Sequence, residues 1–115
     1  MKSTVYAVLF AISAWLATNA AYAGTNQVAI KNFAFVPATL TITAGTTVTW
    51  TNTDEDPHTV ADRGDAHLFR SAALDTNDKY SYTFTTPGSY AYFCTLHPHM
   101  VGKIIVTAST GGVQK

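Results

Sequence analysis

Three side chains that bind soft metals lie close together near the end of the chain. Cys94, the only cysteine, is followed by His97 and then by Met100, with two residues between the members of each pair. A thiolate, an imidazole and a thioether favour copper, and a second histidine would complete a trigonal copper site with a weak axial methionine. His58 is the obvious source of that histidine. The sequence therefore predicts one copper ion held by His58, Cys94, His97 and Met100.

Each of these residues has an ordinary explanation when it is taken alone. His58 would be a surface loop histidine, Cys94 a buried inert thiol, and Met100 a filler of the core. The order and spacing of all four residues favour the copper interpretation instead. Structural zinc is the main rival metal, but zinc usually takes closed sets of cysteine and histidine, to which methionine is a poor fit.

The first 23 residues have the features of a secretory signal peptide. Lys2 gives a basic start, residues 5–16 form an almost unbroken apolar run, and residues 21–23 have the small-x-small form of a cleavage site. The run is too short to span a membrane comfortably, which argues against an anchor. We therefore predict a signal peptide over residues 1–23, export to the periplasm, and one domain over residues 24–115, with a short flexible tail at 107–115.

Composition and charge narrow the range of partners. Hydrophobic residues make up 47% of the chain and charged residues only 12%, so the chain can bury a core. Without Lys2, six of the seven basic residues remain beside seven acidic ones, which gives a formal charge of −1. We therefore expect neither nucleic acid nor an anionic membrane as a partner, and no stable membrane insertion. The lone Cys94 cannot form an internal disulfide, so in an oxidising space it should be buried or metal-bound.

Short runs of β-forming residues, separated by turn signals, cover the chain from residue 28 onward. The expected strands lie at 28–35, 39–43, 46–51, 79–84, 89–94 and 102–107, with short extended pieces between them. About seven or eight strands without a long helix predict an all-β fold, an antiparallel sandwich with Greek-key connections. Tyr90 follows a Pro-Gly turn and is either a tyrosine corner or an ordinary core tyrosine.

The chain from about Val28 to Thr107 resembles a cupredoxin, a small blue copper protein, and is most similar to the amicyanin and pseudoazurin side of that family. Three segments carry the resemblance, namely residues 56–60 (DPHTV), 87–94 (PGSYAYFC) and 94–100 (CTLHPHM). The resemblance implies a cupredoxin-like Greek-key β-sandwich. It also implies a mobile one-electron carrier, with copper cycling between Cu(II) and Cu(I), that is not itself an enzyme.

The resemblance further implies where partners dock. Electrons would pass through the exposed edge of His97, and Leu96, Pro98, Val101 and Pro57 would form a small apolar patch around it. We expect redox proteins as donor and acceptor, a dehydrogenase and a cytochrome among them, and a monomeric carrier. The alternatives are a periplasmic copper-binding or copper-delivery protein and a copper enzyme. An enzyme would need an open coordination position or a second copper centre, and one complete four-ligand set offers neither clearly.

Three features near the ligands remain open at this stage. Thr59, directly after His58, should donate a hydrogen bond across to the ligand loop. His99 is either an exposed loop histidine or, together with His67, part of a second and weaker metal site. The acidic run at 54–56 is either an ordinary solvated loop or a surface that steers a cationic partner.

Overall fold

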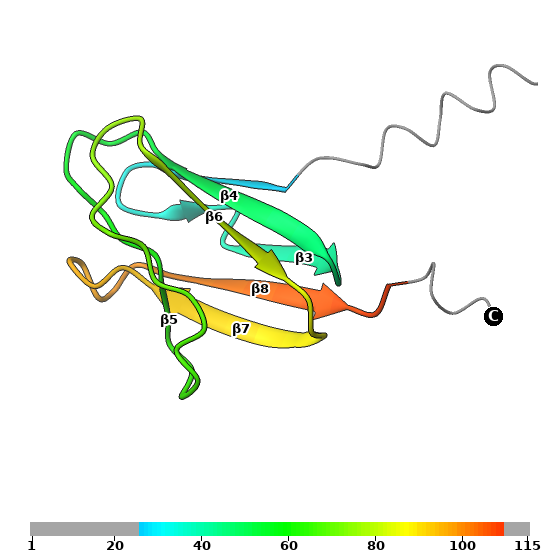
Figure 1. Ribbon diagram of the computed structural model, residues 1–115. Helices are drawn as coiled ribbons and strands as arrows, with labels where there is room; N and C mark the ends of the chain where they lie inside the picture. The colour runs from blue at the N-terminus through cyan, green and yellow to red at the C-terminus, as the bar shows by residue number, and fades with distance from the viewer. Residues whose placement is uncertain (1–25, 110–115) are drawn as a thin grey trace, which may run out of the picture.

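The computed structural model of the protein describes residues 26–109, within which the chain forms eight strands and no helix (Figure 1). The strands are β1 (Gln27–Ile30), β2 (Phe35–Val36), β3 (Thr39–Thr43), β4 (Thr46–Asn52), β5 (Ala61–Asp62), β6 (Lys79–Phe84), β7 (Gly88–Phe93) and β8 (Val101–Thr107). They form two layers, a sheet with the order β2-β1-β4-β6 and a sheet with the order β3-β8-β7-β5. The prediction of an all-β sandwich with seven or eight strands is confirmed.

The antiparallel pairing expected from the sequence holds for four of the six strand pairs, but both sheets are mixed. β1 pairs with β4 and β3 pairs with β8 in parallel, while the other strand pairs are antiparallel. The chain passes from the first sheet to the second between β2 and β3, so β3 lies beside the last strand of the chain. Register pairs such as Thr39 with Lys103 therefore join the beginning and the end of the domain.

The core between the two sheets is built from alternate residues of the strands. In β4, Val48 and Trp50 are completely buried, as the alternation with threonine predicts. The Trp50 ring packs against the rings of Phe69, Phe84 and Tyr92, which come from both layers and from the connection between β5 and β6. This aromatic core gives a firm base to the loops at the end of the sandwich.

Tyr90 near the start of β7 is a tyrosine corner, which decides between the two interpretations of this residue. Its hydroxyl donates a hydrogen bond to the backbone carbonyl of Thr86, four residues earlier in the chain. The bond ties the turn before β7 to the strand that leads into Cys94.

The first predicted strand region, residues 28–35, is interrupted by a two-residue turn. Backbone hydrogen bonds join Lys31 and Ala34 in both directions, at 2.9 and 3.1 Å. Asn32 and Phe33 between them have φ angles of 54° and 59°, which lie in the left-handed region that a type I′ hairpin requires. Such turns usually carry glycine after the asparagine, so Asn-Phe is only a weak signal for a hairpin.

Several predictions about the chain ends fall outside the described residues. The predicted signal peptide at 1–23 lies there, and so do residues 110–115 of the expected tail, whose first residue, Thr107, is the last residue of β8. Within residues 26–109 there is no helix of the length and apolarity needed to cross a membrane.

Candidate metal centre

His58, Cys94 and His97 come together in space. Cys94 directly follows β7, and β4 and β7 both finish at the end of the sandwich on the left of Figure 1. The Sγ atom of Cys94 lies 3.8 Å from Nδ1 of His58 and 3.7 Å from Nδ1 of His97. One ligand atom from each of the three residues lies within 4.8 Å of the other two. Cys94 and His58 are completely buried, whereas His97 is only half-buried. The structure thus places three of the four predicted ligand residues around one point.

The spacing of these atoms is suitable for donors that share one ion. With sulfur and nitrogen bonds of about 2.3 and 2.05 Å, the lengths typical of zinc, two donors bound to one ion lie about 3.6–3.8 Å apart at bond angles between tetrahedral and trigonal. The observed separations of 3.8 and 3.7 Å agree with this range, so both histidines could share one ion with Cys94. Two imidazoles and one thiolate, with a methionine nearby, are the ligand set typical of a blue copper site.

Met100, the predicted axial ligand, ends the short loop that carries Cys94 and His97. Its amide donates a hydrogen bond to the carbonyl of His97 at 2.9 Å, and its carbonyl accepts one from the amide of Cys94 at 3.1 Å. These two bonds turn the chain back on itself between β7 and β8. The Met100 side chain is buried and belongs to the same apolar cluster as Cys94.

Thr59 joins the two loops that supply the ligand residues, as the sequence predicted. Its hydroxyl accepts a hydrogen bond from the Thr95 amide at 2.7 Å and lies 2.8 Å from the Thr95 hydroxyl. Its amide and its hydroxyl also approach the Sγ of Cys94, at 3.3 and 3.8 Å. Hydrogen bonds of this kind orient a ligand and tune the metal that it binds.

Asp54 is bonded within the site rather than solvated, so the ordinary-loop interpretation does not hold for this residue. Its carboxylate lies 2.9 Å from Nε2 of His58 and accepts hydrogen bonds from the amides of Asn32 and Phe33, at 2.7 and 2.9 Å. Partial burial raises the pKa of Asp54, but the bonds from Phe33, Asn32 and His58 outweigh it, so the pKa lies below its ordinary value of 3.8. Asp54 is therefore ionised near neutral pH and accepts at the nitrogen of His58 that faces away from Cys94.

Phe33 is a residue of the site that the sequence did not reveal. Its ring meets the rings of His58 and His97 edge to face, with centroids 5.2 and 5.0 Å apart. The same side chain is 48% exposed, so it contacts both the histidine rings and the solvent. The only signal in the sequence was the turn-forming Asn32 inside an otherwise strand-like run.

The apolar residues expected around His97 are exposed. They are Leu96, Pro98, Val101 and Pro57. His99 and His67 are exposed as well, and neither belongs to a group of three or more potential metal ligands within residues 26–109.

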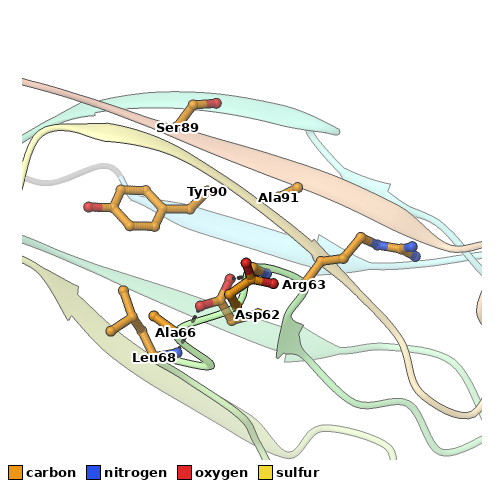
Figure 2. Close-up of a pocket in the computed structure, with 9 residues that line it drawn as sticks. Asp62, Arg63, Ala66, Leu68, Ser89, Tyr90 and Ala91 are labelled. Atoms are coloured by element: carbon orange, nitrogen blue, oxygen red, sulfur yellow. Dashed lines mark hydrogen bonds between the residues drawn. The ribbon is translucent and has the colours of Figure 1, made fainter.

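A shallow pocket of about 440 Å³ lies elsewhere, against β5, β7 and the loop that follows β5 (Figure 2). Asp62 is the buried acid in it, and its carboxylate accepts hydrogen bonds from the amides of Gly64 and Leu68 at 3.0 and 2.8 Å. Arg63 extends away from Asp62 in Figure 2, and its guanidinium lies 4.4 Å from the centre of the Phe93 ring. Asp62 therefore holds the loop in place.

Comparisons with known proteins agree with this geometry. A family model described as "Cupredoxin-like domain" matches residues 3–106. Amicyanin-alpha of Methylorubrum extorquens is 39% identical over 93 residues, which cover 78% of each chain. The chloroplastic plastocyanin of Tetradesmus obliquus is 42% identical over 63% of this chain and 57% of its own. The structure of the Cu(I) form of an amicyanin mutant superimposes with a TM-score of 0.68 at 34% identity, over 72% of this chain and 82% of that one.

The chemistry of the donor atoms, their close spacing and these relatives agree on the nature of the cofactor, which is one copper ion.

Proposed function

Because the chain belongs to the cupredoxin-like family, we propose that it is a mobile one-electron carrier with His58, Cys94, His97 and Met100 as its copper ligands. The observation that carries this proposal is the placement of Cys94 Sγ between two histidine Nδ1 atoms, at 3.8 and 3.7 Å. Bound copper supplies a single couple between Cu(II) and Cu(I). The protein passes electrons between other proteins and is not an enzyme.

The residues around the ligands hold them in position through hydrogen bonds within the protein. Thr59 fixes the ligand loop through Thr95, and the bonds between Met100 and its loop neighbours fix the reversal of the chain. These bonds lie within the protein and none of them involves the ion, so we expect them to persist in both oxidation states. A preorganised site needs little rearrangement when charge changes, which favours rapid electron transfer.

Partners would meet the half-buried ring of His97, which lies next to exposed apolar side chains. Leu96 is 49% exposed and directly precedes His97, while Pro98 directly follows it. A small apolar contact suits a redox encounter, in which partners bind briefly and separate after transfer. The donor and the acceptor are redox proteins in this proposal, and the carrier is a monomer.

The proposal also places the carrier in the periplasm, as the domain over residues 24–115. The support is the basic start, the apolar run at 5–16 and the cleavage-like residues 21–23. Mass spectrometry of the secreted protein tests the boundary, because the mature chain should begin at Gly24.

An absorption spectrum of the oxidised, copper-loaded protein tests the site itself. We expect a strong visible band from thiolate-to-copper charge transfer that is absent from Cys94→Ser. A protein that binds copper but shows no such band would overturn the proposal. Copper delivery remains the alternative function, and kinetics separates the two. A carrier should exchange electrons faster than it loses copper to an acceptor, and the reverse order would favour delivery.

A further inference from the structure

Asp54 connects two separate parts of the candidate metal centre, the turn at residues 32–33 and His58. One carboxylate oxygen accepts from the Asn32 amide at 2.7 Å, and the other lies 2.9 Å from both the Phe33 amide and Nε2 of His58. Its side chain is only 12% exposed, whereas its neighbours Glu55 and Asp56 are exposed. Asp54 therefore differs from the rest of the acidic run in both burial and contacts.

The backbone of Asp54 is held as firmly as its side chain. Its amide donates a hydrogen bond to Oδ1 of Asn52 at 2.9 Å, and its carbonyl accepts one from the Thr76 hydroxyl at 2.7 Å. Asn52 is itself completely buried and donates to the carbonyls of Asp56 and Leu74. The carboxylate thus extends from a fixed frame, and the groups that it contacts are fixed in turn.

The turn that Asp54 binds is strained, and the strain points to a role for the phenylalanine. Asn tolerates the left-handed region, but a bulky residue such as Phe33, with a φ of 59°, is disfavoured there. Glycine would form the same type I′ turn without strain. Backbone strain that is retained near a functional site suggests that the side chain contributes something that glycine cannot. Here that side chain packs against both imidazoles.

The carboxylate also decides which nitrogen of His58 faces the metal. An acceptor 2.9 Å from Nε2 keeps the proton on that nitrogen and leaves the lone pair on Nδ1, which faces Cys94 Sγ at 3.8 Å. Partners of this kind set the tautomer and raise the basicity of a ligating histidine. The proton of His58 and the position of Phe33 therefore depend on one residue.

We propose that Asp54 is a positioning residue of the copper site, which fixes the His58 tautomer and holds Phe33 as a cap over both histidine ligands. The inference rests on the proposed function, because it assigns those histidines to copper. The carboxylate makes His58 a better donor to Cu(II), and the cap slows the entry of solvent and competing ligands. Neither effect requires Asp54 or Phe33 to touch the ion.

The first test compares Asp54→Asn with Asp56→Asn, which makes the same substitution two residues away at an exposed position. We expect Asp54→Asn to weaken copper binding by about 10–100-fold and to raise the reduction potential. Asp56→Asn should change the copper affinity by less than about twofold and leave the reduction potential unchanged. Nitrogen NMR of the His58 ring in the copper-free protein should show the Nε2–H tautomer in the wild type and a mixture in Asp54→Asn. Equal behaviour of the two variants would overturn the proposal.

The second test uses Phe33→Gly, which removes the cap and relieves the turn. We expect the copper-free variant to unfold at the same or a higher urea concentration than the wild type, yet to lose copper to a chelator several-fold faster. A lower unfolding midpoint with unchanged copper loss would mean that Phe33 only packs against its neighbours, and would overturn the role of the cap. The NMR measurement needs no copper, so it can succeed or fail independently of the visible band that tests the proposed function.

Discussion

The Thr59 hydroxyl joins the two ligand loops, and its removal in Thr59→Val should weaken both the fold and the copper site. Valine has the same shape but can neither accept from the Thr95 amide, now at 2.7 Å, nor donate to Cys94 Sγ. Thr59 is buried, so water cannot easily replace the lost group. The part-buried Thr95 amide would lose its partner. A buried donor left unpaired destabilises a protein by about 1–3 kcal/mol, and partial access of water to this amide keeps the loss away from the upper end of that range.

The expected loss for Thr59→Val is therefore about 2 kcal/mol in the free energy of unfolding of the copper-free protein. For a domain of this size, each kcal/mol lowers the melting temperature by about 4–8 °C, so we expect a decrease on the order of 10 °C. The Cys94 sulfur also loses one hydrogen-bond donor and becomes richer in electrons. That change favours Cu(II), so the reduction potential should fall.

Thr47→Val is the matched control for this experiment. Thr47 pairs with Thr83 through their hydroxyls at 2.6 Å, but this pair is exposed and far from the ligands in sequence. Its loss should change the free energy of unfolding by less than about 0.5 kcal/mol and leave the potential unchanged. Calorimetry of the copper-free proteins and redox titration of the loaded ones give the two measurements. If Thr59→Val behaved as Thr47→Val does, the connection between the loops would have no energetic role.

Three other predictions concern the core and the metal. Gly102→Ala should destabilise the fold by about 1–3 kcal/mol, because a Cβ there would overlap the Tyr92 ring, whose hydroxyl would lie only 2.5 Å away. Urea unfolding that matches the wild type would contradict this. Burial raises the pKa of Tyr92 from 10.0 to about 12. As the pH rises, the unfolded chain therefore loses this proton before the folded protein does. Between pH 10 and 12 the free energy of unfolding of the wild type should fall by about 3 kcal/mol more than that of Tyr92→Phe. Urea unfolding measured across this pH range tests the prediction. Copper at 100 times its dissociation constant should stabilise the wild type by about 2.7 kcal/mol but not Cys94→Ser; equal melting shifts would refute thiolate ligation.

The sequence could predict the function of residues whose side-chain chemistry and spacing along the chain already indicate it. Cys94, His97 and Met100 lie within one short loop, and a soft-metal site is the simplest use of that set. Thr59 could be predicted because it directly follows a candidate ligand. The alternation in β4 likewise predicted which of its residues would enter the core.

The remaining features of the site and the fold depend on which segments, distant in the sequence, come into contact. The alternation of apolar and polar residues does not predict those contacts. Asp54 bonds to Asn32, 22 residues earlier, only because the turn after β1 lies beside the loop after β4. Phe33 reaches the histidines only because the backbone adopts a left-handed turn that its sequence does not favour. The sequence did not predict the parallel pairs β1–β4 and β3–β8 for the same reason, because the residue pattern of a strand does not indicate which other strand pairs with it.

The parallel pairing of β3 with β8 also determines the order in which the molecule can be assembled. β8 supplies the last residues of the sandwich, and β3 has no other strand partner within residues 26–109. Pairing Thr39 with Lys103 closes a long loop of the chain and so lowers its conformational entropy. We expect this pairing to form late in folding, when the C-terminal strand joins the sheet. The ligand loop lies between β7 and β8, so its final shape also depends on that last step. A growing chain that still lacks β8 therefore has neither a closed second sheet nor a finished copper site, and copper binding reports that the whole domain has folded.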